Sequence, residues 1–167
     1  MDTQRLDGVP LFSSLDDRAR NAVASMMTER AYPDGAALLT QGERSGGVFV
    51  LLEGSIRVER TLPAGGTVDL VTLGPGALFG TLAVLDGGAR AASCLARGPV
   101  RCGVLPRTAF MDLMDGRTPV ALRFQHAVIC DLFKDIRATN RRLVELAALP
   151  DSQVPMEALT DSIIGLQ

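Results

Sequence analysis

The sequence predicts an α+β protein, an antiparallel β jelly roll (double-stranded β-helix) with an N-terminal helix and a long C-terminal helix. Short apolar runs separated by Gly, Pro and Asp fill the chain from 36 to 105, a spacing typical of barrels and jelly rolls. On either side, apolar residues recur every three or four positions, as in amphipathic helices. We expect one domain at 11–149 and a tail at 150–167 with room for one short helix.

Composition and charge narrow the class of protein. The 167 residues are 47% hydrophobic, which is enough for a packed core, and their net charge is -2. This charge argues against a broad nucleic-acid-binding surface. No apolar run approaches the ~20 residues of a membrane span, and the first residues lack the basic-then-apolar order of a secretion signal. We therefore expect a cytoplasmic protein with neither a nucleic-acid nor a membrane partner.

Residues that build common catalytic and metal sites are scarce. The chain has one histidine, His126, and three cysteines, Cys94, Cys102 and Cys130, without a CxxC motif. Disulfide frameworks and zinc sites normally show closely spaced cysteines, and metal-dependent barrels need several His and carboxylate ligands. We also find no nucleophile–base pair and no cofactor motif. We expect no enzyme and no metal site, with Cys94 and Cys102 in the core.

The first half of the chain predicts one helix followed by short strands. The helix is expected to begin at Ser14, whose hydroxyl can act as a cap, with Asp16 and Asp17 in its first turn. It should end near Glu29, because Tyr32-Pro33-Asp34-Gly35 has turn chemistry. The expected strands, separated by Gly-rich or Pro-rich breaks, are 36–41, 48–54, 55–60, 67–73, 91–96 and 100–105.

The last third predicts a short helix at 108–114 and a long helix at 119–149, capped by Thr118. The long helix carries two apolar ridges. The first consists of Ala121, Phe124, Val128, Leu132, Ile136, Thr139, Leu143 and Leu146, and the second of Leu122, Ile129 and Phe133. A helix about 45 Å long presents more apolar surface than one small barrel covers. We therefore expect a homodimer through helix 119–149, the alternative being a helix that folds back on its own barrel.

The stretch FGTLAVLDGGARAAS at 79–93, which we call the cassette, has the composition of an anion site. Gly80 and Ala83 permit close backbone approach, and the start of a short helix at Thr81 leaves amide groups unpaired. Arg90 follows a tight turn and is expected to be accessible, with small residues after it. Its planar guanidinium suits a phosphate. The alternative is an ordinary loop arginine.

The order of these elements and several motifs resemble the cyclic-nucleotide-binding domain, the sensor of the catabolite activator family and of cyclic-nucleotide-gated channels and kinases. The motifs, which lie between 11 and 149, are FSSL, YPDGAALLTQGE, VFVLLEGSIRV, LGPGALFG and RTAFMDLM. The family's phosphate cassette has the form F-G-E-L-A, several residues, then R-A/S/T-A. Here it reads FGTLA, VLDGGA and RAAS. The resemblance implies a bacterial-type regulatory domain with cyclic AMP as a possible ligand and no cofactor.

The resemblance also implies roles for the cassette residues. Arg90 would pair with the cyclic phosphate. The backbone groups expected around the phosphate are those of Gly80, Leu82, Ala83 and Ala91. The family's ribose-binding glutamate is replaced by Thr81, and losing a charge-assisted hydrogen bond of about 1.5–3 kcal/mol would weaken binding roughly 10- to 150-fold. We expect no acidic substitute, since Glu43 and Glu53 belong to remote loops.

On the long helix, Thr139-Asn140 matches a Thr-Ser pair that contacts the adenine in the catabolite activator branch, one residue from each subunit. Both side chains can accept a hydrogen bond from an amine. The alternatives are a Thr bonded to its own helix and an Asn that sets dimer register. Ala91 lacks the hydroxyl that cyclic-GMP-preferring members often carry, so adenine is the expected base.

Two functions from different classes follow. The first is a stand-alone regulatory domain that senses cyclic AMP or a related nucleotide and signals through its dimer helix to a protein partner. The second is a ligand-independent structural or interaction protein with the same fold and a degenerate pocket. Arg90 and Thr139-Asn140 favour the first function, and Thr81 favours the second.

Overall fold

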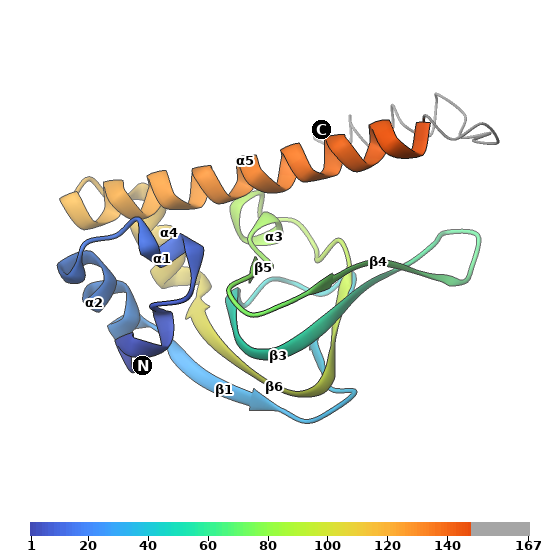
Figure 1. The fold of residues 1–167 in the computed structure, drawn as a ribbon, viewed down its shortest axis with the longest axis horizontal. Coiled ribbons are helices and arrows are strands. Elements are labelled where there is room, and N and C mark those ends of the chain that lie inside the picture. The colour runs from blue at the N-terminus through green and yellow to red at the C-terminus, as the bar shows by residue number, and fades with distance from the viewer. Residues whose placement is uncertain (148–167) are drawn as a thin grey trace. The chain divides into compact units, whose positions relative to one another are not determined.

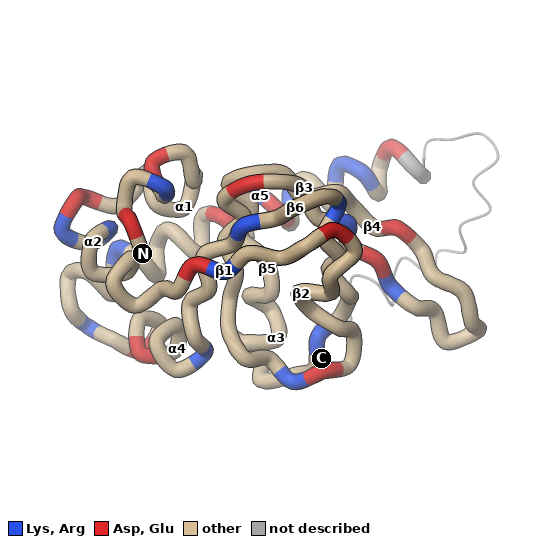
Figure 2. The backbone as a smooth tube through the Cα atoms, turned by 90° about the horizontal axis from the view of Figure 1, so that it is seen from below, with Lys and Arg blue, Asp and Glu red and all other residues tan. Residues whose placement is uncertain are grey.

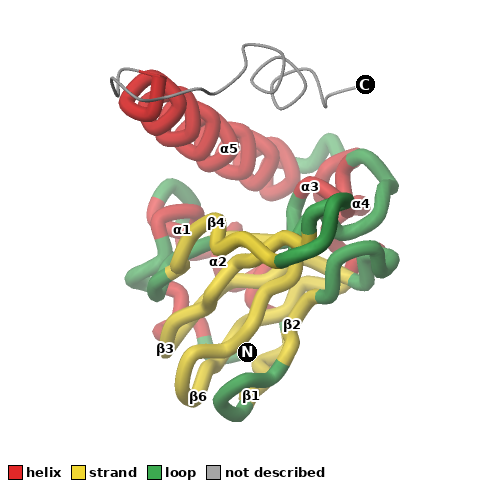
Figure 3. Tube along the Cα trace, turned by 90° about the vertical axis from the view of Figure 1, so that its right-hand side faces the viewer, coloured by secondary structure: helices red, strands yellow, loops and turns green. Residues whose placement is uncertain are grey.

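The structure is a computed structural model that describes residues 1–147, and it confirms the predicted fold class. One compact unit is Met1–Asp131, and a second begins at Leu132. The first unit contains an antiparallel sheet that curls into a jelly roll, with short helices at its ends (Figures 1 and 3). The tail predicted at 150–167 and the predicted helix end at 148–149 lie outside the described residues.

The elements follow one another in the predicted order. The strands are β1 (Thr28–Tyr32), β2 (Ala37–Leu39), β3 (Gly47–Thr61), β4 (Thr67–Leu73), β5 (Leu78–Phe79) and β6 (Ser93–Pro106). The helices are η1 (Thr3–Leu6), α1 (Pro10–Ser13), α2 (Asp17–Met26), α3 (Leu82–Leu85), α4 (Arg107–Asp115) and α5 (Pro119–Ala147). The sheet order is β1-β6-β3-β4, with β2 also paired to β6 and β5 to β3. The long strands β3 and β6 are therefore the centre of the sheet.

Two predicted strand breaks are bends within longer strands. The strands predicted on either side of Gly54 are one strand, β3, and those on either side of 97–99 are one strand, β6. Gly54 and Gly98 have φ values of 89° and 74°, a conformation that glycine adopts without a steric penalty. The β3–β6 register shifts on both sides of Glu53. The glycines therefore bend the sheet and do not end its strands.

The N-terminal helix begins later and ends earlier than predicted. The carboxylate of Asp16 accepts a hydrogen bond from the Ala19 amide at 2.8 Å and caps α2. The hydroxyl of Ser14, the predicted cap, donates to the Leu11 carbonyl instead. Met27 ends α2, and residues 28–29, also predicted as helix, belong to β1, which pairs along its whole length with β6. Pairing with a distant strand thus outweighs the local helical period.

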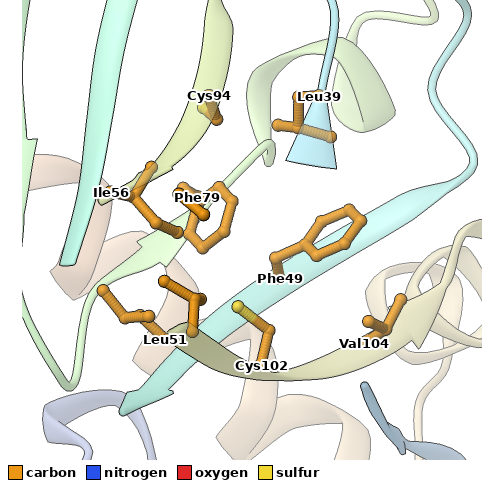
Figure 4. Close-up of a cluster of buried hydrophobic side chains, with 10 residues drawn as sticks. Leu39, Phe49, Leu51, Ile56, Phe79, Cys94, Cys102 and Val104 are labelled. Carbon is orange, nitrogen blue, oxygen red and sulfur yellow. The ribbon is translucent and has the colours of Figure 1, made fainter. Parts of the chain in front are cut away.

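The core of the barrel is apolar and lies between β3, β5 and β6 (Figure 4). Its buried members are Leu39, Phe49, Leu51, Ile56, Phe79, Cys94, Ala96, Val100, Cys102 and Val104. The rings of Phe49 and Phe79 stack at 5.4 Å, which links β3 to the start of the cassette. Cys94 and Cys102 are buried, as predicted, and carry free thiols.

The C-terminal helices agree closely with the prediction. Thr118 caps α5, because its hydroxyl accepts a hydrogen bond from the Ala121 amide at 3.2 Å. The first predicted ridge is buried within the first unit, and Phe124 packs edge-on against Phe110 of α4 at 5.8 Å. The second ridge is uncovered, with Leu122 54% exposed and Ile129 46% exposed.

Charged residues of both signs are interspersed along the described chain in the view of Figure 2. Several form ion pairs between neighbouring elements, such as Arg101 of β6 with Glu29 of β1 at 2.6 Å. Of the helices within residues 1–147, none combines the length and apolar character needed to cross a membrane.

Gly54 and Gly65 provide a matched test of the bend in β3. Both have a φ of 89°, but a Cβ on Gly54 would lie 2.5 Å from the Pro99 carbonyl oxygen, whereas one on Gly65 would meet nothing within 4 Å. The left-handed conformation costs a side chain about 1–2 kcal/mol, and overpacking adds about 1–3 kcal/mol. In urea unfolding we expect Gly65→Ala to lose about 1 kcal/mol and Gly54→Ala about 3 kcal/mol or more. Equal losses would contradict the close packing of β3 on β6.

Candidate functional site

The cassette folds as a turn, the short helix α3 and a second turn between β5 and β6, as predicted. Gly80 has a φ of 76°, and Thr81 precedes the first residue of α3. The turn after α3 is closed by Asp86, whose carboxylate accepts a hydrogen bond from the Gly88 amide at 2.8 Å. These turns carry the chain back to Arg90.

Arg90 is buried, which corrects the expectation of an accessible loop arginine. Its side chain and backbone together are only 5% exposed. The guanidinium donates from Nη1 to the Gly80 carbonyl at 2.5 Å and from Nη2 to the Gly47 carbonyl at 2.6 Å. Hydrogen bonds from a charged donor are stronger than neutral ones. The two bonds hold the cation between the cassette and the first residue of β3.

The partners of the guanidinium are carbonyl dipoles and not carboxylates. Burial lowers the pKa of Arg90 from its usual value, although an arginine stays protonated at physiological pH. Removing a charge from water is costly unless a charge of opposite sign accompanies it. The two carbonyls accept hydrogen bonds from Arg90, but they carry no negative charge to balance its positive charge. The surroundings of this side chain therefore favour an anion.

The β2–β3 loop lies beside Arg90, contrary to the expectation that Glu43 is remote. The backbone amide of Arg90 donates to the Glu43 carbonyl at 2.9 Å, and the amide of Gly42 donates to the Arg90 carbonyl at 2.9 Å. Arg44 and Ala89 form an adjacent β-bridge. The Glu43 side chain is exposed, so its backbone makes the contact. Pairing between two loops far apart in the sequence has no local pattern that predicts it.

Thr81 is 5% exposed and makes no side-chain capping bond to α3. It directly follows Gly80, the glycine that accepts the Nη1 bond of Arg90. The fold therefore brings together the residues predicted for ribose and phosphate. The other predicted phosphate residues surround them, with Ala83 buried and Leu82 and Ala91 exposed.

An apolar wall continues from Arg90 across the sheet. Val58 of β3 pairs with Cys94 of β6 on one side and with Val71 of β4 on the other. Burial raises the pKa of the Cys94 thiol to about 11, and the nearby Arg90 cation opposes that rise. Val71 is 39% exposed, so apolar surface remains open along this wall. A cation next to an apolar wall can bind an anion that carries a ring. The alternating pattern of SIRVER and TVDLVTL contains these residues, but that pattern alone predicts strands and not a site.

Arg107, which the sequence analysis did not assign to the site, supports the cassette from α4. Its Nη1 donates to the Ala83 carbonyl at 3.3 Å, and its backbone amide donates to the Gly46 carbonyl at 3.0 Å. It therefore ties α3 and the β2–β3 loop to the first turn of α4.

The predicted base-contacting residues, Thr139 and Asn140, lie in the second unit and are exposed. The cassette and its surroundings lie in the first unit. A contact of Thr139 or Asn140 with a bound base stays a prediction.

Comparisons with known proteins agree with this geometry. Residues 29–117, more than half of the chain, match the family profile described as "Cyclic nucleotide-binding domain". The chain belongs to the cyclic nucleotide-binding domain family. The matched segment contains β3, β4, the cassette and β6, so the site described above falls within the family domain.

Relatives of this cyclic nucleotide-binding domain are regulatory proteins. The curated "Cyclic AMP receptor protein" of Thermus thermophilus is 35% identical over 91 residues, which are 54% of this chain and 42% of the relative. The solved structure of the Thermus thermophilus catabolite activator protein superposes with a TM-score of 0.70 at 30% identity. The matched region is 83% of this chain and 63% of the catabolite activator chain. The regulatory domain of Toxoplasma gondii PKA, solved with cAMP, has a TM-score of 0.67 at 25% identity. Its matched region is 82% of this chain and 48% of the PKA chain. The chain thus spans less than half of the curated relative.

The two buried thiols predict that the domain loses stability at alkaline pH. Burial raises the pKa of Cys94 to about 11 and that of Cys102 to about 12, whereas a thiol of an unfolded chain titrates near pH 8.5. Between about pH 9 and 11 the unfolded chain binds fewer protons than the folded one, so the free energy of unfolding falls as the pH rises. In urea titrations the fall should be on the order of 1 kcal/mol per pH unit for each thiol.

Substitutions of the two buried thiols test this prediction. Cys94→Ala and Cys102→Ala should each reduce the slope of stability against pH, because each removes one thiol with a raised pKa. A slope that is the same in wild type and Cys94→Ala would contradict the contribution of Cys94.

Proposed function

We propose that the chain is a regulatory module that binds cyclic AMP, or a closely related cyclic nucleotide, at Arg90. The observation that carries this proposal is the buried guanidinium, whose hydrogen-bond partners are the uncharged carbonyls of Gly80 and Gly47. A cyclic phosphate supplies both a negative charge and oxygens that match the planar fork of an arginine. The relatives described as a cyclic AMP receptor and as a complex with cAMP support this class of ligand.

The remaining parts of the nucleotide have places around Arg90. The first amides of α3, at Leu82 and Ala83, precede the helix hydrogen bonds and can donate to the phosphate with the backbone of Gly80 and Ala91. Thr81 would meet the ribose with a neutral hydroxyl. The apolar wall at Val58 and Val71 offers a surface for the base. Because Thr81 carries no charge, we expect micromolar and not tighter affinity.

The output of the module would be helix α5, in a homodimer formed through residues 119–149. Leu122 and Ile129 leave an apolar ridge of α5 uncovered within the first unit, and Phe133 and Ile136 are exposed further along the helix. Their spacings of seven, four and three residues place them on one helical face. A second copy of the chain would cover this face, bring Thr139 and Asn140 towards the bases and transmit ligand binding to a protein partner in the cytoplasm.

A ligand-independent interaction protein is the second candidate function. The observation that favours it is that two donors of Arg90 already have carbonyl acceptors, so Arg90 also has a structural role. The neutral Thr81 in place of a carboxylate also favours a ligand-independent protein, because it would bind a ribose more weakly. In that case the fold and the dimer helix would serve protein binding alone.

Calorimetric titration with cyclic AMP, cyclic GMP and cyclic di-GMP separates the two functions. We expect cyclic AMP to bind with micromolar affinity, and Arg90→Lys to weaken it about 100-fold, because a lysine keeps the charge but loses the planar fork of parallel donors that pairs with two phosphate oxygens. The matched control is Arg97→Lys, since Arg97 is an exposed arginine of β6, and it should bind as wild type does. Circular dichroism confirms that each variant is folded. No binding to any of the three nucleotides would favour the interaction protein.

Restoring the family's glutamate tests the position of the ribose. Thr81→Glu should tighten cyclic AMP binding about tenfold or more, because a carboxylate accepts stronger hydrogen bonds from the ribose hydroxyl. Thr81→Gln, which has a similar shape without the charge, should gain less. Equal affinities of wild type and Thr81→Glu would show that the ribose does not lie at this position.

A further inference from the structure

Arg107, the first residue of α4, contacts the same two segments that Arg90 joins. Its Nη1 donates to the Ala83 carbonyl at 3.3 Å, and its backbone amide donates to the Gly46 carbonyl at 3.0 Å. Arg90 donates to the next carbonyl of that loop, at Gly47, and to a second carbonyl of the cassette. The cassette and the β2–β3 loop are therefore held from two sides, by Arg90 and by a helix.

The short helix α3 depends on contacts outside itself. It has only four residues, far fewer than a helix needs to be stable alone. The amides at its end donate to the carbonyls of Thr81 and Leu82 at 3.0 to 3.1 Å, whereas the Ala83 carbonyl accepts from Arg107. A cationic donor is favourable there, because the last carbonyls of a helix carry partial negative charge. Arg107 thus fixes the helix whose first amides are proposed to bind the phosphate.

Side-chain contacts join α4 to the start of α5. The buried rings of Phe110 and Phe124 meet edge-on with their centres 5.8 Å apart. The side-chain amide of Gln125 donates from Nε2 to the Leu113 carbonyl at 2.9 Å and to the Gly116 carbonyl at 2.8 Å. All these residues belong to the first unit. Because such interiors are closely packed, a displacement of α4 requires the start of α5 to move or repack.

We infer that Arg107 is the positioning residue that couples the nucleotide site to α4 and the start of α5. The inference rests on the nucleotide site proposed above. A phosphate at Arg90 would draw on the donors that hold the carbonyls of Gly80 and Gly47. Arg107 would keep α3 and the β2–β3 loop attached to α4 and pass a change in the position of α3 to that helix. It acts through the Ala83 carbonyl and not through the ligand.

Two substitutions of Arg107 distinguish this role from direct phosphate binding in calorimetric titrations with cyclic AMP. Arg107→Gln removes the charge-assisted bond to Ala83 and should weaken binding about tenfold. Arg107→Lys keeps a cationic donor for one carbonyl and should bind within about threefold of wild type, unlike Arg90→Lys. The matched control is Arg117→Gln, an exposed arginine two residues after α4, and it should bind as wild type does. Circular dichroism confirms that each variant is folded.

Hydrogen exchange measured by mass spectrometry on the full chain tests the coupling directly. In the free chain, Arg107→Gln should speed exchange of the amides at 84–86, which close α3, about threefold or more. Saturating cyclic AMP should slow exchange in α3, in α4 and at 119–131 of the wild type. In Arg107→Gln it should still slow α3 but leave α4 and 119–131 unchanged. Arg107→Lys should restore the response of α4, and Arg117→Gln should respond as wild type does.

Three results would overturn the inference. One is equal exchange at 84–86 in free wild type and free Arg107→Gln. Another is a response of α4 to cyclic AMP that persists in Arg107→Gln. The third is faster exchange of Arg107→Gln throughout β3 and β6, which would assign Arg107 a general structural role. A wild type that binds no cyclic AMP would overturn the proposed function and the coupling together, while exchange in the free chain still decides whether Arg107 positions α3.

Discussion

One buried cation joins the parts of the site. Arg90 donates to the carbonyls of Gly80 and Gly47, and its backbone pairs with Glu43, so the cassette, β3 and the β2–β3 loop meet at a single residue. A buried charge costs several kcal/mol unless its surroundings compensate it, and this cost couples the three segments. Position 80 favours glycine, because a Cβ there would lie 2.7 Å from Nη1 of Arg90 in a backbone with a φ of 76° and would push the guanidinium away.

The hydrogen bonds from Arg90 to the carbonyls of Gly80 and Gly47 also affect how a ligand would bind. A cyclic phosphate would compete with the carbonyls for the donors of Arg90. The free energy gained is then that of the new hydrogen bond to the phosphate minus that of the carbonyl bond it replaces. What the phosphate adds is negative charge, which carbonyls lack. With Thr81 in place of a carboxylate, a bound ribose would contribute less binding energy than a ribose held by a glutamate. A ligand of this kind can shift α5 only as far as its affinity differs between two positions of the helix.

Local chemistry made part of this structure predictable. The cassette turns, α4 and the start of α5 follow from Gly, Asp, Thr118 and Pro119, whose effects reach only a few residues. The predictions that were wrong concern residues whose partners lie far away in the sequence. β1 forms because β6 pairs with it, and Arg90 is held by hydrogen bonds to the carbonyls of Gly47 and Glu43. Gly54 bends β3 and does not end it, a distinction that the sequence does not reveal because a glycine with positive φ can do either. The roles of Thr139 and Asn140 rest on family resemblance alone.

A crystal structure of the chain with cyclic AMP tests the central role of Arg90 most directly. We expect the guanidinium of Arg90 within hydrogen-bond distance of the phosphate oxygens, with its bonds to Gly80 and Gly47 lengthened or shared, and the ribose at Thr81. A nucleotide bound elsewhere, with Arg90 still held by the two carbonyls alone, would contradict the account and leave Arg90 as a structural residue of the barrel.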